Sequence, residues 1–168
     1  MASVTSLTPA EIAALPTATI AGLTTANVSL LTTAQLAALT SAQIAALGTG
    51  NITALASANI SALSSAALAG LTAAEAAVLT TGQLTSLGSS QLAALSSAAL
   101  AGLGSGITAI GTTAFAGLRS AQLAALSSTE AAALTTAQAA ALTGIQVKGL
   151  SAIGMANLTT AAVSVLST

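Results

Sequence analysis

The sequence lacks histidine, cysteine, aspartate, tryptophan and tyrosine, and only a handful of its 168 residues carry a charge. The charged residues are Glu11, Glu75, Arg119, Glu130 and Lys148. General acids and bases, activated nucleophiles and metal ligands come mostly from the residue types that are missing or scarce. We therefore expect no catalytic residue, no cofactor and no metal, so the chain is predicted not to be an enzyme.

The formal net charge is −1, which also argues against nucleic acid as a partner. Phosphate binding requires clustered lysine and arginine, and this chain has one of each, far apart in sequence. A surface with so few charges lacks the mutual repulsion that keeps protein molecules apart. The partner that the composition favours is another copy of the chain.

The mean hydropathy of +0.94 suggests a membrane protein, but the spacing of polar residues argues against insertion. Nearly every eight residues bring two hydroxyls, so that no run of about twenty apolar residues exists. The first residues, from Met1 to Pro9, show no basic segment followed by an apolar one, so no secretory signal is expected there. Without cysteine, the composition is compatible with a cytoplasmic or an extracellular location.

An eight-residue repeat organises the whole sequence. Leucine recurs every eight residues from Leu7 to Leu103 and, after one seven-residue unit, again from Leu118 to Leu166. This gives twenty units between Leu7 and Val165, with a register slip at 103–110, and the run 102–107 at this slip contains three glycines. We expect one repeat domain over residues 1–168, since no segment looks like a second domain.

Each position of the octad has its own chemistry. Position one is leucine, with isoleucine once, and position six is mostly Ile, Leu or Val. Positions two and three are mostly Ser or Thr, and position five is often Gln, Asn or Glu. A continuous helix would turn such leucines around its circumference, because eight is not a multiple of 3.6. A heptad coiled coil is excluded for the same reason.

A helix that restarts in every octad fits the pattern. With position two as N-cap, Thr8 and Glu11 form a capping box with Pro9 at the first helical position. The same spacing recurs in Thr32 with Gln35, Thr40 with Gln43, Thr72 with Glu75, Ser127 with Glu130 and Thr135 with Gln138. Glycine at position eight falls where such a helix must stop. Helices this short are stable only when stacked, which predicts an all-α solenoid with one very short helix per octad.

A right-handed β-solenoid is the alternative fold. The segments 58–62 and 66–70 look like pentapeptide-repeat motifs with three residues added. Alanine, leucine and glutamine favour helices, however, and β-branched residues are sparse at the apolar positions. We expect the single aromatic residue, Phe115, to be a core residue, because it occupies position six of its unit.

The end units lack the polar cap that usually covers the last apolar layer of a monomeric repeat protein. We therefore predict assembly through the first octad and the last one, at Leu7, Ile12, Leu15, Leu158, Val163 and Leu166. The units starting at Leu142 and Leu150 are bulkier than the rest, and Ile145, Ile153 and Met155 are predicted to form a lateral contact.

The runs 31–46 and 118–141 resemble the Leu-Thr-Thr-Ala-Gln-Ile-Ala-Ala octapeptide arrays of large bacterial surface and secreted proteins, which are described as adhesin-like. The resemblance implies an extracellular or cell-surface structural role. Because this chain is short and shows no separate adhesive module, we expect a subunit that polymerises head to tail into a filament or sheath.

A second hypothesis is a binding surface for ice or another adhesive target. The hydroxyls of positions two and three recur at nearly constant spacing and could form an array that orders water. Their use as helix caps is the simpler explanation of the same spacing.

Overall fold

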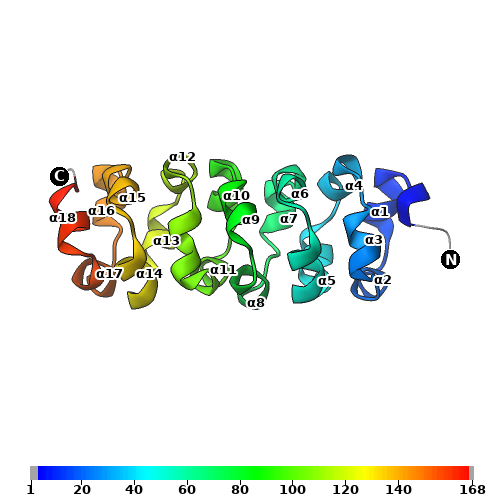
Figure 1. Cartoon of the computed structure of the whole chain (residues 1–168), viewed down its shortest axis with the longest axis horizontal. Helices are drawn as coiled ribbons and strands as arrows, with labels where there is room; N and C mark the ends of the chain where they lie inside the picture. Colours follow the sequence, from blue (N-terminus) through cyan, green and yellow to red (C-terminus); the bar gives the residue numbers. More distant parts are fainter. Residues whose placement is uncertain (1–3, 167–168) are drawn as a thin grey trace.

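The computed structural model describes residues 4–166, and the described part of the chain contains α-helices and 3₁₀ turns but no strand. The chain winds into a rod whose two termini lie at opposite ends (Figure 1). The rod is a solenoid of very short helices, as predicted, and the β-solenoid alternative is wrong.

The helices succeed one another with only a few residues between them. They are η1 (Val4–Ser6), α1 (Pro9–Ala14), α2 (Thr17–Ala21), α3 (Thr25–Ser29), α4 (Thr33–Ala37), α5 (Ser41–Ala54), α6 (Ser57–Ala62), α7 (Ser65–Leu68), α8 (Ala73–Ala77), α9 (Thr81–Thr85) and α10 (Ser89–Ala94). There follow α11 (Ser97–Gly102), η2 (Gly104–Ala109), α12 (Thr112–Phe115), α13 (Ser120–Ala124), α14 (Ser128–Ala133), α15 (Thr136–Ala140), α16 (Gly144–Lys148), α17 (Ala152–Asn157) and α18 (Thr160–Ser164).

Capping boxes start many of these helices, as the octad predicts. In α4, Gln35 N–H donates to Thr32 Oγ1 at 3.3 Å, and Thr32 N–H donates to Gln35 Oε1 at 2.9 Å. Two orphan donors are thus satisfied within one turn of helix. All six predicted boxes are present, and further ones form at Thr24, Thr80 and Thr143.

Two glycines with positive φ mark the irregular places. Gly48, with φ of 77°, lies within α5, which therefore consists of two short helices joined by a kink. Gly104, with φ of 52°, opens η2, the 3₁₀ segment that occupies the seven-residue unit. Glycine alone adopts this backbone region without steric cost. The 3₁₀ segment thus coincides with the seven-residue unit of the sequence, and helices of octad spacing continue on both sides of it.

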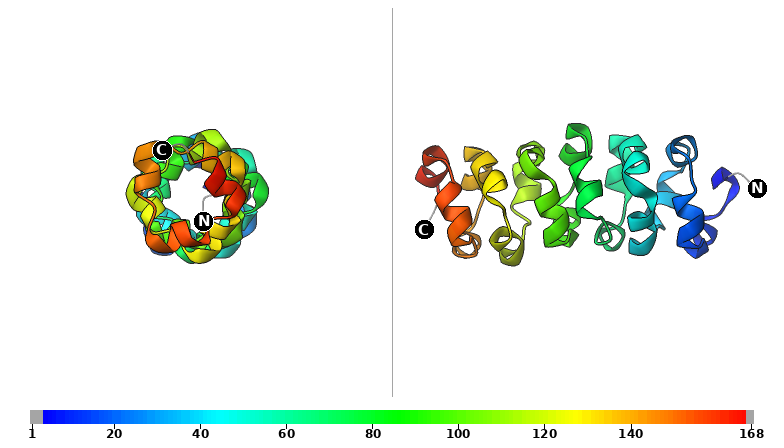
Figure 2. Two further views of the ribbon diagram at one scale, coloured as in Figure 1. Left: turned by 90° about the vertical axis from the view of Figure 1, so that its left-hand side faces the viewer. Right: turned by 90° about the horizontal axis from the view of Figure 1, so that it is seen from below.

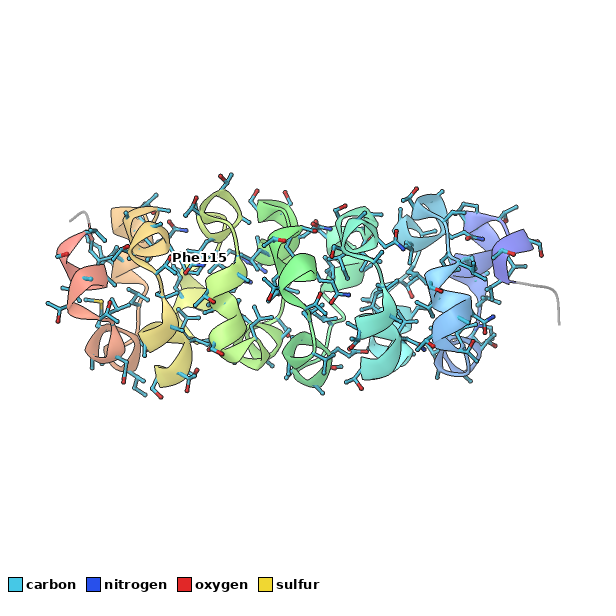
Figure 3. The ribbon with its side chains drawn as sticks, viewed as in Figure 1. Phe115 is labelled. Carbon is cyan, nitrogen blue, oxygen red and sulfur yellow. The ribbon has the colours of Figure 1, made fainter. Side chains whose placement is uncertain are left out.

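Positions one and six fill the interior of the rod. Seen end-on, the helices form a ring (Figure 2), and their side chains point into the space that the ribbon leaves open (Figure 3). One continuous apolar cluster runs through the described chain and includes Phe115, which is fully buried on α12 as predicted. Burial of this cluster is what allows helices of four to six residues to persist.

The glutamines at position five join successive turns of the solenoid. Gln43 Nε2 donates to Ile12 O at 2.8 Å and to Leu15 O at 2.9 Å, 31 and 28 residues earlier. Because 28 residues are three and a half octads, this is about the length of one solenoid turn. The carbonyl of position one lies outside the helical bonding pattern, and the amide supplies its donor.

Every glutamine of the sequence makes this bridge. Each glutamine Nε2 donates to backbone carbonyls of the preceding turn, and each Oε1 accepts from the N–H of the N-cap residue of its own helix. All seven glutamines are buried: Gln35, Gln43, Gln83, Gln91, Gln122, Gln138 and Gln146. The capping function was predicted from the spacing, whereas the bridge between turns was not.

Glycine at position eight lies at or next to the end of its helix, as predicted, and has a second function. The backbone at Gly70 and Gly102 is not left-handed, but a Cβ at Gly70 would lie 1.9 Å from Ser41 O, and one at Gly102 would lie 2.3 Å from Ala73 O. Both neighbours belong to the preceding turn. The missing side chain therefore allows two turns to touch through their backbones.

Candidate assembly interface

The first turn of the solenoid leaves its position-one leucines partly uncovered. Leu7, Leu15 and Leu23 are half-buried, whereas the position-six residues of the same octads are buried. Those buried residues are Ile12, Ile20 and Val28. In the middle of the rod both positions are buried, apart from the half-buried Leu79, so the side chains of position one depend on the preceding turn for their cover. We call Leu7, Leu15 and Leu23 the N-terminal face.

The last turn leaves the opposite layer uncovered. Met155 and Val163 occupy position six and are 39% and 45% exposed, while Val147, also at position six, is partly buried. The position-one residues Leu142 and Leu150 of the same turn remain buried. Leu158 and Leu166, at position one of the final units, are half-buried. We call Val147, Met155, Leu158, Val163 and Leu166 the C-terminal face.

The two faces are complementary in the way that neighbouring turns are. Position-six residues are exposed where no turn follows, and position-one residues where no turn precedes. Stacking one face on the other would reproduce the contact that covers both positions inside the rod, for example between α1 and α4 or between α15 and α18. Apolar residues gathered at an end of a protein in this way commonly mark an interaction surface.

Exposed bulky residues on the side of the rod concentrate near the C-terminal end. Ile145 is 78% exposed and Ile153 is 61% exposed, both at position four, where most octads have alanine. Val165 is also exposed, and Leu30 is the one such residue outside residues 145–165 among those described. The predicted lateral residues thus lie on the surface, but Met155 belongs to the C-terminal face by its position in the octad.

The other predicted assembly residues lie where the octad places them, with one difference. Leu7, Leu15, Leu158, Val163 and Leu166 are accessible at their respective ends. Ile12 is only 1% exposed and therefore offers no surface to a partner. The octad pattern by itself does not distinguish positions one and six at the two ends. In the structure, the N-terminal end uncovers the position-one side chains and the C-terminal end uncovers the position-six side chains.

Leu23 and Val147 were missed as members of the two faces. The signal for them was the length of a solenoid turn, because each face consists of about three and a half octads and not of one. That length became visible only with the glutamine bridges, since the octad pattern does not specify how many units close one turn.

The charged residues occupy distinct kinds of place. Glu11 is exposed at position five of the first turn, where its Oε2 accepts from Thr8 N–H at 2.7 Å and from Thr8 Oγ1 at 2.8 Å. These hydrogen bonds, chiefly the one from the Thr8 backbone, lower the pKa of the Glu11 carboxyl. Lys148 is exposed at position seven of its octad, where it is the last residue of α16, in the last turn of the solenoid.

The other three charged residues lie between the two end turns of the rod; Glu75 and Glu130 are buried, and Arg119 is exposed. Glu75 is buried, and its Oε1 accepts from Gly48 N–H at 3.1 Å. Glu130 is also buried; its Oε2 accepts from Ser127, while its Oε1 has no hydrogen-bond partner. The Arg119 guanidinium donates to Ala93 O on the preceding turn. These residues take part in helix starts and contacts between turns.

Among the helices of the described chain, none combines the length and the apolar character that crossing a bilayer requires.

The comparison with protein families gives one match. The ALTTAQ repeat model matches residues 4–41 and 30–57, which confirms that the N-terminal third is a repeat array of this type. Neither the curated proteins nor the solved structures contain a significant match to the chain. Residues 4–57 are thus similar to ALTTAQ repeats in sequence, and the structure shows short helices at octad spacing in the rest of the described chain.

Proposed function

We propose that the chain is a structural subunit that stacks head to tail with copies of itself into a filament or sheath. The observation that carries the proposal is the complementarity of the two end faces. The N-terminal face presents uncovered position-one leucines, and the C-terminal face presents uncovered position-six residues. A second copy offers the layer that each face lacks, in the same geometry as the next turn of the solenoid.

The apolar area at such a joint is large enough to drive association. Complete burial of a Leu, Val or Met side chain contributes about 1.5–3 kcal/mol, and the eight residues of the two faces would each gain part of that value. Their sum opposes a cost of association of about 4–15 kcal/mol. The low net charge adds little repulsion between copies.

The hydroxyl array has a local function that supports the structural proposal over a binding surface for ice. Position-two hydroxyls accept from backbone N–H groups at helix starts, for example Thr80 Oγ1 from Gln83 N–H at 3.3 Å. Their regular spacing therefore follows from the spacing of the helices and requires no ligand. A location outside the cell or on its surface is part of our proposal and is supported by the resemblance of the repeat alone.

The test is to follow assembly of the purified chain by sedimentation velocity and negative-stain electron microscopy over a range of concentrations. We expect unbranched filaments about as wide as the rod. Replacing Val163 and Leu166 together by lysine should abolish them, because two charges would have to be buried in each joint. The matched control is the double variant Ala69→Lys with Ala77→Lys, which adds the same charges at exposed positions near the middle of the rod.

Two results would overturn the proposal. One is a wild-type chain that stays monomeric at every concentration and salt strength. The other is normal filament growth by the Val163→Lys and Leu166→Lys double variant, which would place the contact elsewhere. Ile153→Lys separates end-to-end growth from lateral association: single filaments should persist, and bundles should disappear.

A further inference from the structure

Inside the rod, position five of one turn lies against position seven of the turn before it. Gln43 Nε2 lies 3.3 Å from Ala13 O, and Gln91 Nε2 lies 3.3 Å from Ser61 O, in both cases 30 residues apart. The side chain of Gln146 reaches Ala116 O with the same separation, at 2.8 Å. The two positions are therefore neighbours wherever one turn rests on another.

At the two ends of the rod these two positions carry opposite charges. Glu11 is at position five of the first turn, and Lys148 is at position seven of the last turn. Both side chains are exposed, and neither has a charged partner within its own copy among the described contacts. If a second copy continued the octad register, Glu11 would follow Lys148 by the same 30-residue step that relates Gln43 to Ala13.

The carboxylate of Glu11, at position five, would favour one register of a second copy over the others, whereas a glutamine amide there would accept several. The bridging glutamines donate to carbonyl groups, which every position of a turn can supply. A carboxylate accepts only, so it is unfavourable against carbonyls and needs a donor opposite it. Glu75 illustrates this requirement inside the rod, because its second oxygen lies against the N–H of Gly48 at the kink of α5.

A long cationic side chain can reach across the contact between two turns. The Arg119 guanidinium donates to Ala93 O on the preceding turn, so a cation at this boundary has a precedent within the chain. Lys148 is the one cationic residue of the last turn. It is thus the charged donor that the C-terminal end of the rod, next to the C-terminal face, offers to a carboxylate.

We infer that Lys148 of one copy forms an ion pair with Glu11 of the copy stacked on its C-terminal face and thereby fixes the rotation between stacked subunits. This inference rests on the proposed head-to-tail assembly. The leucines of the N-terminal face resemble one another and permit several rotations. The ion pair selects the one in which the octad continues without a change of register.

The test uses charge reversal in two separate proteins. Glu11→Lys has lysine at both faces, and Lys148→Glu has glutamate at both faces. Each alone should need a roughly three- to tenfold higher concentration for half-maximal assembly, as expected for one exposed pair replaced by like charges. An equimolar mixture should regain wild-type assembly, because every joint of an alternating filament would again pair opposite charges.

The matched controls are Ala69→Lys and Ala69→Glu, which change charge at an exposed position seven near the middle of the rod, 30 residues before the uncharged Ala99, and should leave assembly unchanged. Circular dichroism should show the same helical fold for all variants, with a slightly lower thermal midpoint for Glu11→Lys, which loses the hydrogen bonds from Thr8. A second measurement is the rotation per subunit from filament images, which should be uniform in the wild type and variable in Glu11→Lys.

The outcomes separate this inference from the proposal on which it depends. Wild-type filaments whose assembly is unchanged by both single reversals, or a mixture no better than its components, would overturn the ion pair and leave head-to-tail stacking intact. A wild-type chain that does not assemble would overturn both.

Discussion

Two kinds of octad solve the contact between turns in different ways. In the octad 79–86, Gln83 bridges two turns by donating to Ile52 O and Leu55 O, both at 2.8 Å. In the octad 63–70, position five is the buried Ala67, and Gly70 allows the backbone to touch the turn before. One contact satisfies backbone carbonyls with a side-chain amide, and the other removes side chains so that backbones pack directly.

The alanine-and-glycine solution recurs as a unit. Ala99 with Gly102 and Ala114 with Gly117 repeat the combination, and a Cβ at Gly117 would lie 2.6 Å from the Ser89 side chain. The octad 142–149 combines both solutions, because Gln146 Nε2 donates to Leu118 O at 2.7 Å and a Cβ at Gly149 would lie 2.7 Å from the Ser120 side chain. Position five therefore carries more structural information than its polar character suggests.

The largest effect is expected where a bridging amide becomes a carboxylate. Gln83→Glu would place a buried charge against two carbonyl oxygens, and we expect a loss of about 3–5 kcal/mol in the free energy of unfolding. Urea denaturation followed by circular dichroism measures it. The control is Thr19→Glu, at the exposed position five of the first turn, which should change stability by less than about 0.5 kcal/mol. Equal effects at both sites would contradict the bridge.

An added methyl group tests the backbone contact. Gly70→Ala would bring a Cβ to 1.9 Å from Ser41 O, so the two turns must separate, at a cost of about 1–3 kcal/mol. Gly50→Ala is the matched control, because a Cβ added there would have no atom within 4 Å and alanine favours the helix. Thermal unfolding should therefore show a lower midpoint for the first variant and an unchanged or higher one for the second.

The two buried glutamates should respond in opposite directions to the same substitution. Glu75→Gln would place the side-chain NH₂ group opposite the N–H of Gly48, where it cannot accept the hydrogen bond that Glu75 Oε1 accepts. The loss of this bond should lower the free energy of unfolding by about 1–3 kcal/mol. Glu130→Gln removes a buried carboxylate oxygen that has no partner, so stability should rise by about 1 kcal/mol. Denaturation of both variants in parallel provides the comparison, and a loss at both sites would show that Glu130 Oε1 has a donor.

The smallest expected effect is on the pH dependence of stability and concerns Glu11, which occupies position five in the first turn of the solenoid. Hydrogen bonds from Thr8 lower the pKa of the Glu11 carboxyl in the folded chain. A group with a lowered folded pKa stabilises the fold above its unfolded pKa, and this contribution is lost as the pH falls through the folded value. Glu11→Gln should therefore flatten the acid side of the stability profile slightly, as followed by thermal unfolding between neutral and acidic pH. An unchanged profile would argue against the Thr8 contact.

Much of the fold follows from the sequence because capping is a local matter. Thr32 and Gln35 are three residues apart, and their pairing depends on neither the rest of the rod nor its interior. The same holds for the core, since positions one and six follow from the helix start. The helical solenoid could thus be derived from one octad and its repetition.

The contacts between turns could not be derived in this way. Gln43 and Leu15 are 28 residues apart, and no local rule relates them. The close approach of Gly70 to Ser41 likewise depends on the length of a turn, so the glycine resembled an ordinary helix stop. The two end faces were predicted only in part for the same reason, since their membership depends on which octads share a turn.

A turn of about three and a half octads gives the rod the symmetry of a screw in which octads seven apart return to the same side. Gly48 and Gly104 lie 56 residues apart, which is seven octads, so the two kinks share one azimuth on the rod. Adding or deleting a single octad would preserve every stacking contact beyond it but rotate that part by more than a quarter turn. Length can therefore vary in steps of eight without loss of fold, while any one-sided surface feature requires steps of 56.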